Sequence, residues 1–182
     1  MKRYFISDPA YYHDLASFET YLVKAFETHL PDFVCFRDKI NPDIAPYAIR
    51  FLEIAESYNL SRTLINRDVA LAKRLGFWGV HLTSSQHAQI SQASRDFYTV
   101  VSTHTLDEAR LAADAGADAV TISPIFSSPG KGVAKGIDYL CHYVQKMEEV
   151  EVFALGGIVT DEDIASIAPC KPYGFASIRY FV

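Results

Sequence analysis

The segment Val150-Glu-Val-Phe-Ala-Leu155 is followed by Gly156-Gly157-Ile158 and then by Thr160-Asp-Glu-Asp163. The apolar run has the length and composition of a buried strand. A threonine followed by three acidic residues is typical of an N-cap and a first helical turn. Glycines between a strand and a helix let backbone N–H groups approach an anion closely. The segment therefore predicts a strand, a phosphate loop and a helix in a parallel α/β sheet.

The same alternation of short apolar and longer amphipathic runs extends over the whole chain, which predicts repeated βα units. We expect strands at Arg3–Ser7, Phe33–Arg37, Thr63–Asn66, Trp78–Leu82, Tyr98–Ser102, Asp118–Ile122, Val150–Leu155 and Tyr173–Ile178. The first helix carries an apolar stripe at helical spacing, formed by Leu15, Phe18, Leu22 and Phe26. Thr105 and Glu108 predict a capping box at a later helix. No linker divides the chain, so residues 1–182 are expected to form a single domain.

The length of 182 residues decides between two α/β architectures. A (β/α)₈ barrel usually needs roughly 250 residues, which by itself favours a smaller open sheet. Eight units of about 23 residues nevertheless fit if every loop is short. We therefore expect a compact (β/α)₈ TIM barrel that lacks the final helix. The uncovered flank of the last strand should be closed by Tyr180-Phe181-Val182 or by a second subunit.

Composition and charge exclude several classes of function. With 17 Lys+Arg against 22 Asp+Glu, the net charge of −5 provides no general basic field for nucleic acid or an anionic membrane. The cysteines Cys35, Cys141 and Cys170 lie far apart and form no CxxC pair, which argues against a disulfide framework and a zinc site. Asp8 and Pro9 interrupt any apolar leader at the start. We expect a reduced, soluble, cytoplasmic protein.

Charged and polar residues follow several predicted strands, at the edge where a parallel barrel carries its active site. The cations are Arg37, Lys39, Arg67 and Lys131, and Asn66 adds an amide. Cations that converge from separate strands neutralise a phosphate or diphosphate, Arg through a planar fork and Lys as a point charge. A charged surface loop is the simpler alternative for any one of them. Their shared position favours an anion site.

Two histidines are candidate acid–base groups, since imidazole titrates near neutral pH. His81 ends the fourth predicted strand and His104 follows the fifth. The alternative for His81 is a core histidine bonded to backbone, and for His104 a residue near a helix start without a catalytic role. Cys35 has no neighbouring base to activate its thiol, so we expect a small buried residue there.

In this order, the strand-end segments resemble the thiamine phosphate synthase and TenI superfamily over nearly the whole chain. The matching segments are Tyr4-Phe-Ile-Ser-Asp8, Arg37-Asp-Lys39, Leu64-Ile-Asn66, Gly79-Val-His-Leu82, Val101-Ser-Thr-His-Thr105, Ala115-Gly-Ala-Asp118, Ser123-Pro-Ile-Phe126, Gly156-Gly-Ile158 and Gly174-Phe-Ala-Ser-Ile178. The resemblance implies a (β/α)₈ barrel. For the synthase branch it implies the joining of a hydroxymethylpyrimidine diphosphate to a thiazole phosphate with release of diphosphate.

The resemblance also assigns roles to individual residues. Ser102 would touch the pyrimidine. The resemblance places Arg37, Lys39, Asn66 and Lys131 at the diphosphate and Gly156 and Gly157 at the thiazole phosphate. Together with the candidates named above, the expected site then has three groups: the catalytic residues Lys131, Ser102, His81 and His104; the diphosphate-binding residues Arg37, Lys39, Asn66 and Arg67; and the phosphate-binding residues Gly156, Gly157, Ser128 and Arg179. Arg179 stands where the family has a serine that helps to hold phosphate.

Other positions depart from the two enzyme patterns. The synthase pattern places Mg²⁺-binding aspartates right after the third-strand Asn and four residues after the fourth-strand Leu, where this chain has Arg67 and Gln86. We expect that this metal site is lost unless the loop turns Asp68 back into it. Arg67 could instead stabilise a departing diphosphate in place of Mg²⁺. In the TenI branch the acid–base histidine falls where this chain has Pro124.

Three hypotheses about function follow. The first is a synthase-type pyrimidine transfer in thiamine biosynthesis. The second is a TenI-like thiazole tautomerase that uses His81 or His104. The third is a non-catalytic protein that binds a phosphorylated ligand, because the Mg²⁺ aspartates and the tautomerase histidine are both replaced. We favour an enzyme whose partners are a small phosphorylated substrate and a second copy of the chain in a homodimer.

Overall fold

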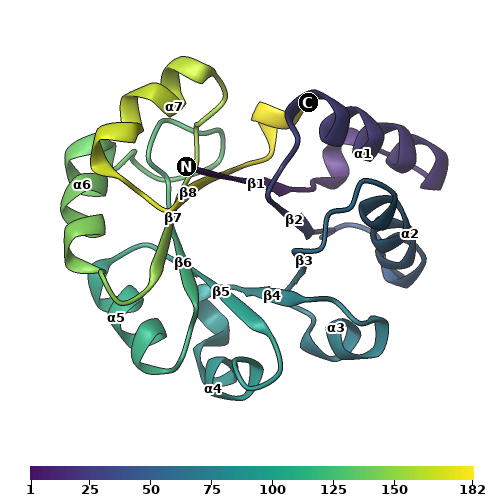
Figure 1. Ribbon diagram of the computed structural model, residues 1–182, viewed down its shortest axis with the longest axis horizontal. Coiled ribbons are helices and arrows are strands. Elements are labelled where there is room, and N and C mark those ends of the chain that lie inside the picture. Colours follow the sequence, from purple (N-terminus) through teal and green to yellow (C-terminus); the bar gives the residue numbers. More distant parts are fainter.

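A computed structural model describes residues 1–182 and contains a closed barrel of eight parallel strands surrounded by helices (Figure 1). The strands are β1 Lys2–Ile6, β2 Phe33–Phe36, β3 Thr63–Asn66, β4 Gly79–Leu82, β5 Tyr98–Thr103, β6 Ala119–Ile122, β7 Glu151–Leu155 and β8 Gly174–Ser177. Each strand pairs with the next along the chain, and β8 closes the barrel against β1. The predicted (β/α)₈ fold is confirmed, and no strand end differs from its predicted position by more than one residue.

Seven α-helices and three 3-10 helices lie between the strands, and a fourth 3-10 helix follows β8. They are η1 Pro9–Tyr11, α1 Leu15–His29, α2 Ala45–Ser57, α3 Val69–Leu75, η2 Ser84–Gln89, α4 Ile90–Ala93, α5 Leu106–Asp114, α6 Gly136–Lys146, α7 Asp161–Ile167, η3 Ala168–Cys170 and η4 Arg179–Phe181. The sequence did not predict η2 and α4, because this polar stretch lacks an apolar stripe. None of the helices combines the length and apolar composition needed to cross a membrane.

Side-chain caps start several of the helices. Thr160 and Asp163 form a capping box at α7. At α5, Thr105 accepts a hydrogen bond from the backbone N–H of Glu108, as the sequence predicts. A capping box also requires the Glu108 carboxylate to accept from the backbone N–H of Thr105. That part of the prediction is wrong, because the carboxylate accepts from the backbone N–H of His104.

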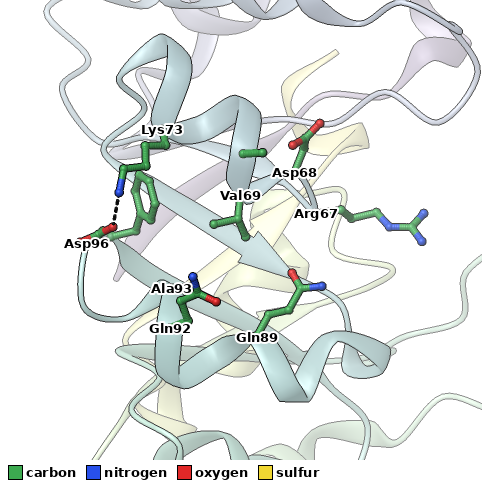
Figure 2. Close-up of a pocket in the computed structure, with 10 residues that line it drawn as sticks. Arg67, Asp68, Val69, Lys73, Gln89, Gln92, Ala93 and Asp96 are labelled. Atoms are coloured by element: carbon green, nitrogen blue, oxygen red, sulfur yellow. Dashed lines mark hydrogen bonds and ion pairs between the residues drawn. The ribbon is translucent and has the colours of Figure 1, made fainter.

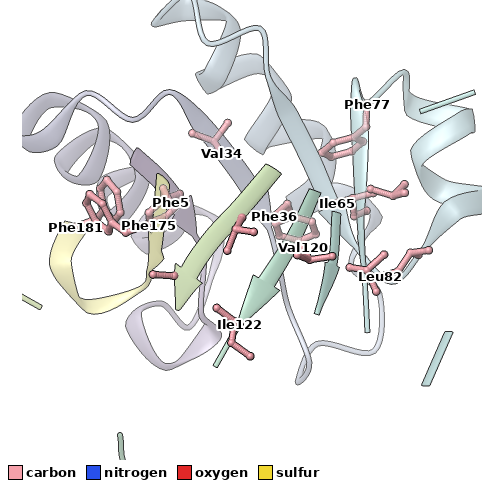
Figure 3. Packing of buried hydrophobic residues seen from close by; sticks show 14 of the residues in the cluster. Phe5, Val34, Phe36, Ile65, Phe77, Leu82, Val120, Ile122, Phe175 and Phe181 are labelled. Carbon is pink, nitrogen blue, oxygen red and sulfur yellow. The ribbon is translucent and has the colours of Figure 1, made fainter. Parts of the chain in front are cut away.

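Alternation along the strands separates two apolar layers. The barrel interior is filled by Tyr4, Ile6, Phe33, Cys35, Leu64, Val100, Ala119, Phe153 and Ala176. The residues between them pack outward against the helices in a larger cluster that includes Phe5, Val34, Phe36, Val120 and Phe175 (Figure 3). Because successive strand residues point to opposite sides, Asn66, His81 and Ser102 share the inward register at the carboxyl ends of their strands.

The residues after β8 form the short helix η4 where an eighth α-helix would otherwise stand. Phe181 is 1% exposed, and its ring lies edge-on to Phe5 with 5.4 Å between the centroids. Tyr180 packs against Phe175 from β8 and against His29 at the end of α1. Figure 1 shows this C-terminal segment beside α1. The aromatic tail therefore covers the flank of β8 within one chain, which is the first of the two predicted covers.

The expectation of three reduced cysteines is wrong. Cys141 in α6 and Cys170 in η3 form a disulfide across 29 residues of sequence. Their distance along the chain conceals this pairing, because the barrel places α6 beside the turn that follows α7. Cys35 is free and buried in the barrel interior, as expected, and burial raises the pKa of its thiol to about 12.

Candidate functional site

A cavity of about 470 Å³, here called the mouth cavity, opens at the carboxyl ends of the strands. Its wall comes from the strand ends and from the loops that follow them. Eleven of the twelve predicted site residues line it: Arg37, Lys39, Asn66, His81, Ser102, His104, Ser128, Lys131, Gly156, Gly157 and Arg179. The barrel thus brings together residues that lie more than a hundred positions apart in the sequence.

The cations of the mouth cavity are mostly without a carboxylate partner. Arg37 Nη1 donates to Asp8 Oδ2 over 2.7 Å, and Asp8 is the only acidic residue in the cavity wall. Lys39, Lys131 and Arg179 make no salt bridge. Four cationic side chains therefore face one carboxylate, although the chain as a whole is acidic. A local positive field of this kind attracts anions to a concave site.

Neighbouring cations affect the pKa of Lys39. Partial burial lowers the pKa of its ammonium group, and the positive charges of Arg37, Lys131 and Arg67 lower it further. Both effects disfavour the protonated form. A phosphate or diphosphate between these groups would relieve their repulsion.

Arg67 is the one predicted site residue that does not line the mouth cavity. It adopts a left-handed φ of 72° at the turn between β3 and α3, where the N–H of Asp68 donates to the carbonyl of Asn66. It borders a groove between α3 and α4. Figure 2 shows its side chain extending away from the Lys73–Asp96 ion pair in that groove. Its positive charge nonetheless contributes to the lowered pKa of Lys39, which follows the neighbouring strand β2.

The residues at the positions of the Mg²⁺ aspartates do not fit a metal site. The side chain of Gln86 is hydrogen-bonded to the backbone: its oxygen accepts from the N–H of Thr83, and its amide donates to the carbonyl of Arg67. Asp68 caps α3 by accepting from the N–H of Leu71 at 2.8 Å, so the loop does not turn it back toward the mouth. No three His, Cys, Asp or Glu side chains gather as metal ligands.

The Gly156-Gly157 loop, which follows β7, forms another part of the wall of the mouth cavity. Both glycines have left-handed φ values, 95° and 75°, and a Cβ at Gly157 would lie 2.6 Å from Phe126 Cβ. Asp163 accepts hydrogen bonds from the N–H groups of Val159 and Thr160. The N–H groups of Gly157 and Ile158 have no partner in the chain. Two successive unpaired N–H groups in a loop suit an anion.

The two candidate histidines occupy different environments. His81 is buried between Tyr4 and Ser102, and burial together with the charge of Arg37 lowers its pKa to about 3. It is therefore neutral at physiological pH, which makes it a poor proton donor. His104 is exposed in the mouth cavity, and its Nδ1 lies 3.1 Å from the carbonyl oxygen of Ser123.

Sequence reasoning missed three residues of this site. Asp8 lies two residues after the end of β1, so the same search for polar strand ends could have found it. Ser177 ends β8, and its hydroxyl donates to the carbonyl of Ile158, which braces the glycine loop. Tyr4 gave no signal, because an aromatic residue inside a strand is usually part of the core.

The fold and the site define a (β/α)₈ barrel whose mouth combines unpaired cations with a glycine loop. The chain matches the family described as Thiamine monophosphate synthase (TMP-TENI) over residues 3–181. It belongs to that family, and the predicted superfamily is confirmed.

Individual relatives agree with this assignment. The thiamine-phosphate synthase of Bacillus thuringiensis (strain Al Hakam) is 29% identical over 150 residues, which cover 80% of this chain and 63% of that protein. The chain thus matches less than two thirds of that relative's length. Thiamine phosphate pyrophosphorylase from Pyrococcus furiosus has a TM-score of 0.81 at 21% identity, over 97% of this chain and 85% of its own. The Bacteroides thetaiotaomicron enzyme of the same name has a TM-score of 0.66 at 21% identity, over 99% and 84%.

Proposed function

We propose that the mouth cavity catalyses the transfer of hydroxymethylpyrimidine from its diphosphate to thiazole phosphate, giving thiamine phosphate and diphosphate. One observation carries this proposal: a group of cations and a glycine loop, each suited to an anion, line a single cavity. Two phosphorylated substrates need two such regions. Membership of the family supports the same reaction.

This reaction requires mainly that the protein stabilise the charge of the departing diphosphate and position the two substrates. The bond between the hydroxymethyl carbon and the diphosphate oxygen breaks, and both electrons leave with the diphosphate. The thiazole nitrogen then gives its lone pair to that carbon, so a C–N bond forms and the ring nitrogen becomes cationic. No proton has to move in either step. Preorganised charges are the strongest aid that a protein can give to such a departure.

The cationic wall would bind the leaving group. Arg37 is oriented by Asp8 and offers a planar fork, whereas Lys39 and Lys131 supply point charges. Arg67 adds positive potential from the rim, at one of the two positions that the family resemblance gives to Mg²⁺-binding aspartates. The N–H groups of Gly157 and Ile158 would hold the thiazole phosphate.

The test is turnover by the purified full chain supplied with both substrates, once with Mg²⁺ and once with a chelator. We expect thiamine phosphate and diphosphate in equal amounts. Lys131→Gln should lower the rate at least about tenfold. Lys135→Gln is the matched control, since Lys135 lies in the same loop but outside the cavity wall and packs on Tyr139. Absence of product under both conditions overturns the proposal.

A thiazole tautomerase is the second candidate, and the exposed imidazole of His104 in the mouth cavity favours it. That activity would isomerise the carboxylated thiazole phosphate, and His104→Ala would abolish it. The third candidate, a phosphate-ligand binder, is favoured by the side chains of Gln86 and Asp68, which are committed to backbone bonds. Calorimetric binding of thiazole phosphate without either turnover would select it.

A further inference from the structure

We infer that Tyr4 and His81 are positioning residues that fix the hydroxyl of Ser102 as a hydrogen-bond donor toward the ligand. Tyr4 Oη lies 3.0 Å from His81 Nδ1, and His81 Nε2 lies 3.0 Å from Ser102 Oγ. The three side chains come from β1, β4 and β5 and lead from the barrel interior to the wall of the mouth cavity. The inference rests on the proposed function only for the identity of the ligand.

The direction of the chain of hydrogen bonds begins at Tyr4. Its side chain is fully buried, and burial raises the pKa of its hydroxyl well above the usual value, so the group keeps its proton. Two side chains lie beside this hydroxyl: His81, whose Nδ1 is 3.0 Å away, and Cys35, whose thiol is the second neighbour. The thiol of the neighbouring Cys35 points to the carbonyl of Phe36. Because sulfur accepts hydrogen bonds only weakly and a poorly paired buried hydroxyl proton is costly, Tyr4 donates to the imidazole and Nδ1 accepts.

The tautomer of His81 follows from this donation. The imidazole is neutral, so a ring whose Nδ1 accepts must carry its proton on Nε2. Nε2 then donates to Ser102 Oγ. In a reversed chain, with the proton on Nδ1, the hydroxyl proton of Tyr4 would have only the weakly accepting sulfur of Cys35 as a partner.

Ser102 is the end of the chain of hydrogen bonds. Its oxygen accepts from His81 and makes no other hydrogen bond in the protein. Its own proton therefore has no acceptor in the chain, and the residue lines the mouth cavity. Ser102 should select ligands that present an acceptor there, such as a ring nitrogen with a free lone pair, over analogues that present an N–H. This is a matched hydrogen bond of the kind that gives binding sites their selectivity.

The tautomer can be measured directly in the ligand-free full chain labelled with ¹⁵N-histidine. We expect the His81 signal, assigned by its loss in His81→Gln, to show a protonated Nε2 and an accepting Nδ1 between about pH 5 and pH 8. Tyr4→Phe removes only the donor, so the preference for Nε2–H should disappear. Tyr98→Phe, which removes a hydroxyl bonded to Glu151 at the opposite end of the barrel, should leave the signal unchanged.

Affinity gives the second measurement. Tyr4→Phe should weaken binding of hydroxymethylpyrimidine diphosphate about five- to tenfold and leave binding of thiazole phosphate unchanged. His81→Gln keeps an N–H donor near Ser102 and should retain most of the affinity, whereas His81→Leu should lose as much as Ser102→Ala.

Three results would overturn the inference: an Nδ1–H tautomer in the wild-type protein, an unchanged tautomer in Tyr4→Phe, or equal affinities for His81→Gln and His81→Leu. Since the tautomer is read without ligand, a failure of the proposed function would appear only in the turnover assay. The spectrum of the wild-type protein shows which nitrogen of His81 carries the proton. It therefore tests the direction of the hydrogen bonds even if a variant fails to fold.

Discussion

Arg37 Nη1 lies 2.7 Å from Asp8 Oδ2, so the carboxylate that follows β1 holds the guanidinium that follows β2. The hydroxyl of Ser7 also accepts from the backbone N–H of Arg37 and donates to its carbonyl. These bonds fix Arg37 before any ligand binds. Lys39, two residues further on, makes no salt bridge. The mouth cavity therefore combines one oriented cation with others that are unpaired.

Removal of the oriented cation should weaken diphosphate binding. Arg37→Gln deletes a charge-assisted hydrogen bond, which is worth about 1.5–3 kcal/mol, so we expect a loss of affinity for inorganic diphosphate of roughly 10- to 100-fold. Calorimetric titration with inorganic diphosphate measures this loss of affinity. Arg50→Gln is the control, because Arg50 on α2 pairs with Glu19 and Glu53 outside the mouth. Equal affinities of the two variants would place the diphosphate elsewhere.

Lys39 should make diphosphate binding depend on pH. Its pKa is lowered by burial and by neighbouring cations, so the ammonium loses its proton at a lower pH than an ordinary lysine. A bound anion stabilises the ammonium and raises that pKa. Affinity for diphosphate should therefore fall as the pH rises through the titration of Lys39. Lys39→Arg keeps its charge and should show a flatter profile; parallel profiles would contradict this role.

The glycine loop should not tolerate a side chain. At Gly157, a methyl group would meet Phe126 at 2.6 Å and the φ of 75° is unfavourable for alanine, so Gly157→Ala should cost about 2 kcal/mol or more. It should also weaken thiazole phosphate binding. Gly132→Ala is the control, since a Cβ there meets nothing within 4 Å. Urea unfolding and calorimetry measure the two effects, and a fully stable Gly157→Ala would refute the packing argument.

The aromatic tail should contribute strongly to stability. Phe181 is buried against Phe5 and Phe175, so Phe181→Ala should lower the free energy of unfolding by about 3–5 kcal/mol. Leu111→Ala, at a side chain that is 55% exposed, should change it by less than about 0.5 kcal/mol. Comparable effects of the two substitutions would mean that the tail does not cover the flank of β8.

The disulfide gives a prediction that needs no ligand. Non-reduced protein, once denatured, should present a single titratable thiol, from Cys35. Reduction of Cys141–Cys170 should lower the free energy of unfolding by roughly 3–4 kcal/mol, given the 29 residues that the bond spans. Three titratable thiols before reduction would contradict the pairing.

Much of the fold could be predicted from the sequence, because strands in a barrel leave a local signal. The apolar run before Gly156 and the cap at Thr160 are local patterns, and the structure contains both. The polar strand ends Arg37 and Ser102 follow from the rule that barrel loops meet at one edge. Local patterns of this kind locate the mouth cavity without any tertiary information.

The remaining features depend on packing between distant segments. The disulfide of Cys141 needs α6 and η3 to lie together. Arg67 leaves the cavity wall because a left-handed turn redirects its side chain, and no glycine marks that turn in the sequence. The contact of Tyr4 with His81 joins residues that are 77 positions apart. None of these could be read from spacing or composition.

The most direct measurement is a calorimetric titration of inorganic diphosphate into protein already saturated with thiazole phosphate. Arg37 follows β2 and Gly157 follows β7, so on the proposed function we expect diphosphate to bind one-to-one without displacing the thiazole phosphate. Arg37→Gln should weaken only the diphosphate, and Gly157→Ala only the thiazole phosphate. Competition between the two ligands, or failure of diphosphate to bind at all, would contradict the presence of two separate subsites in this barrel.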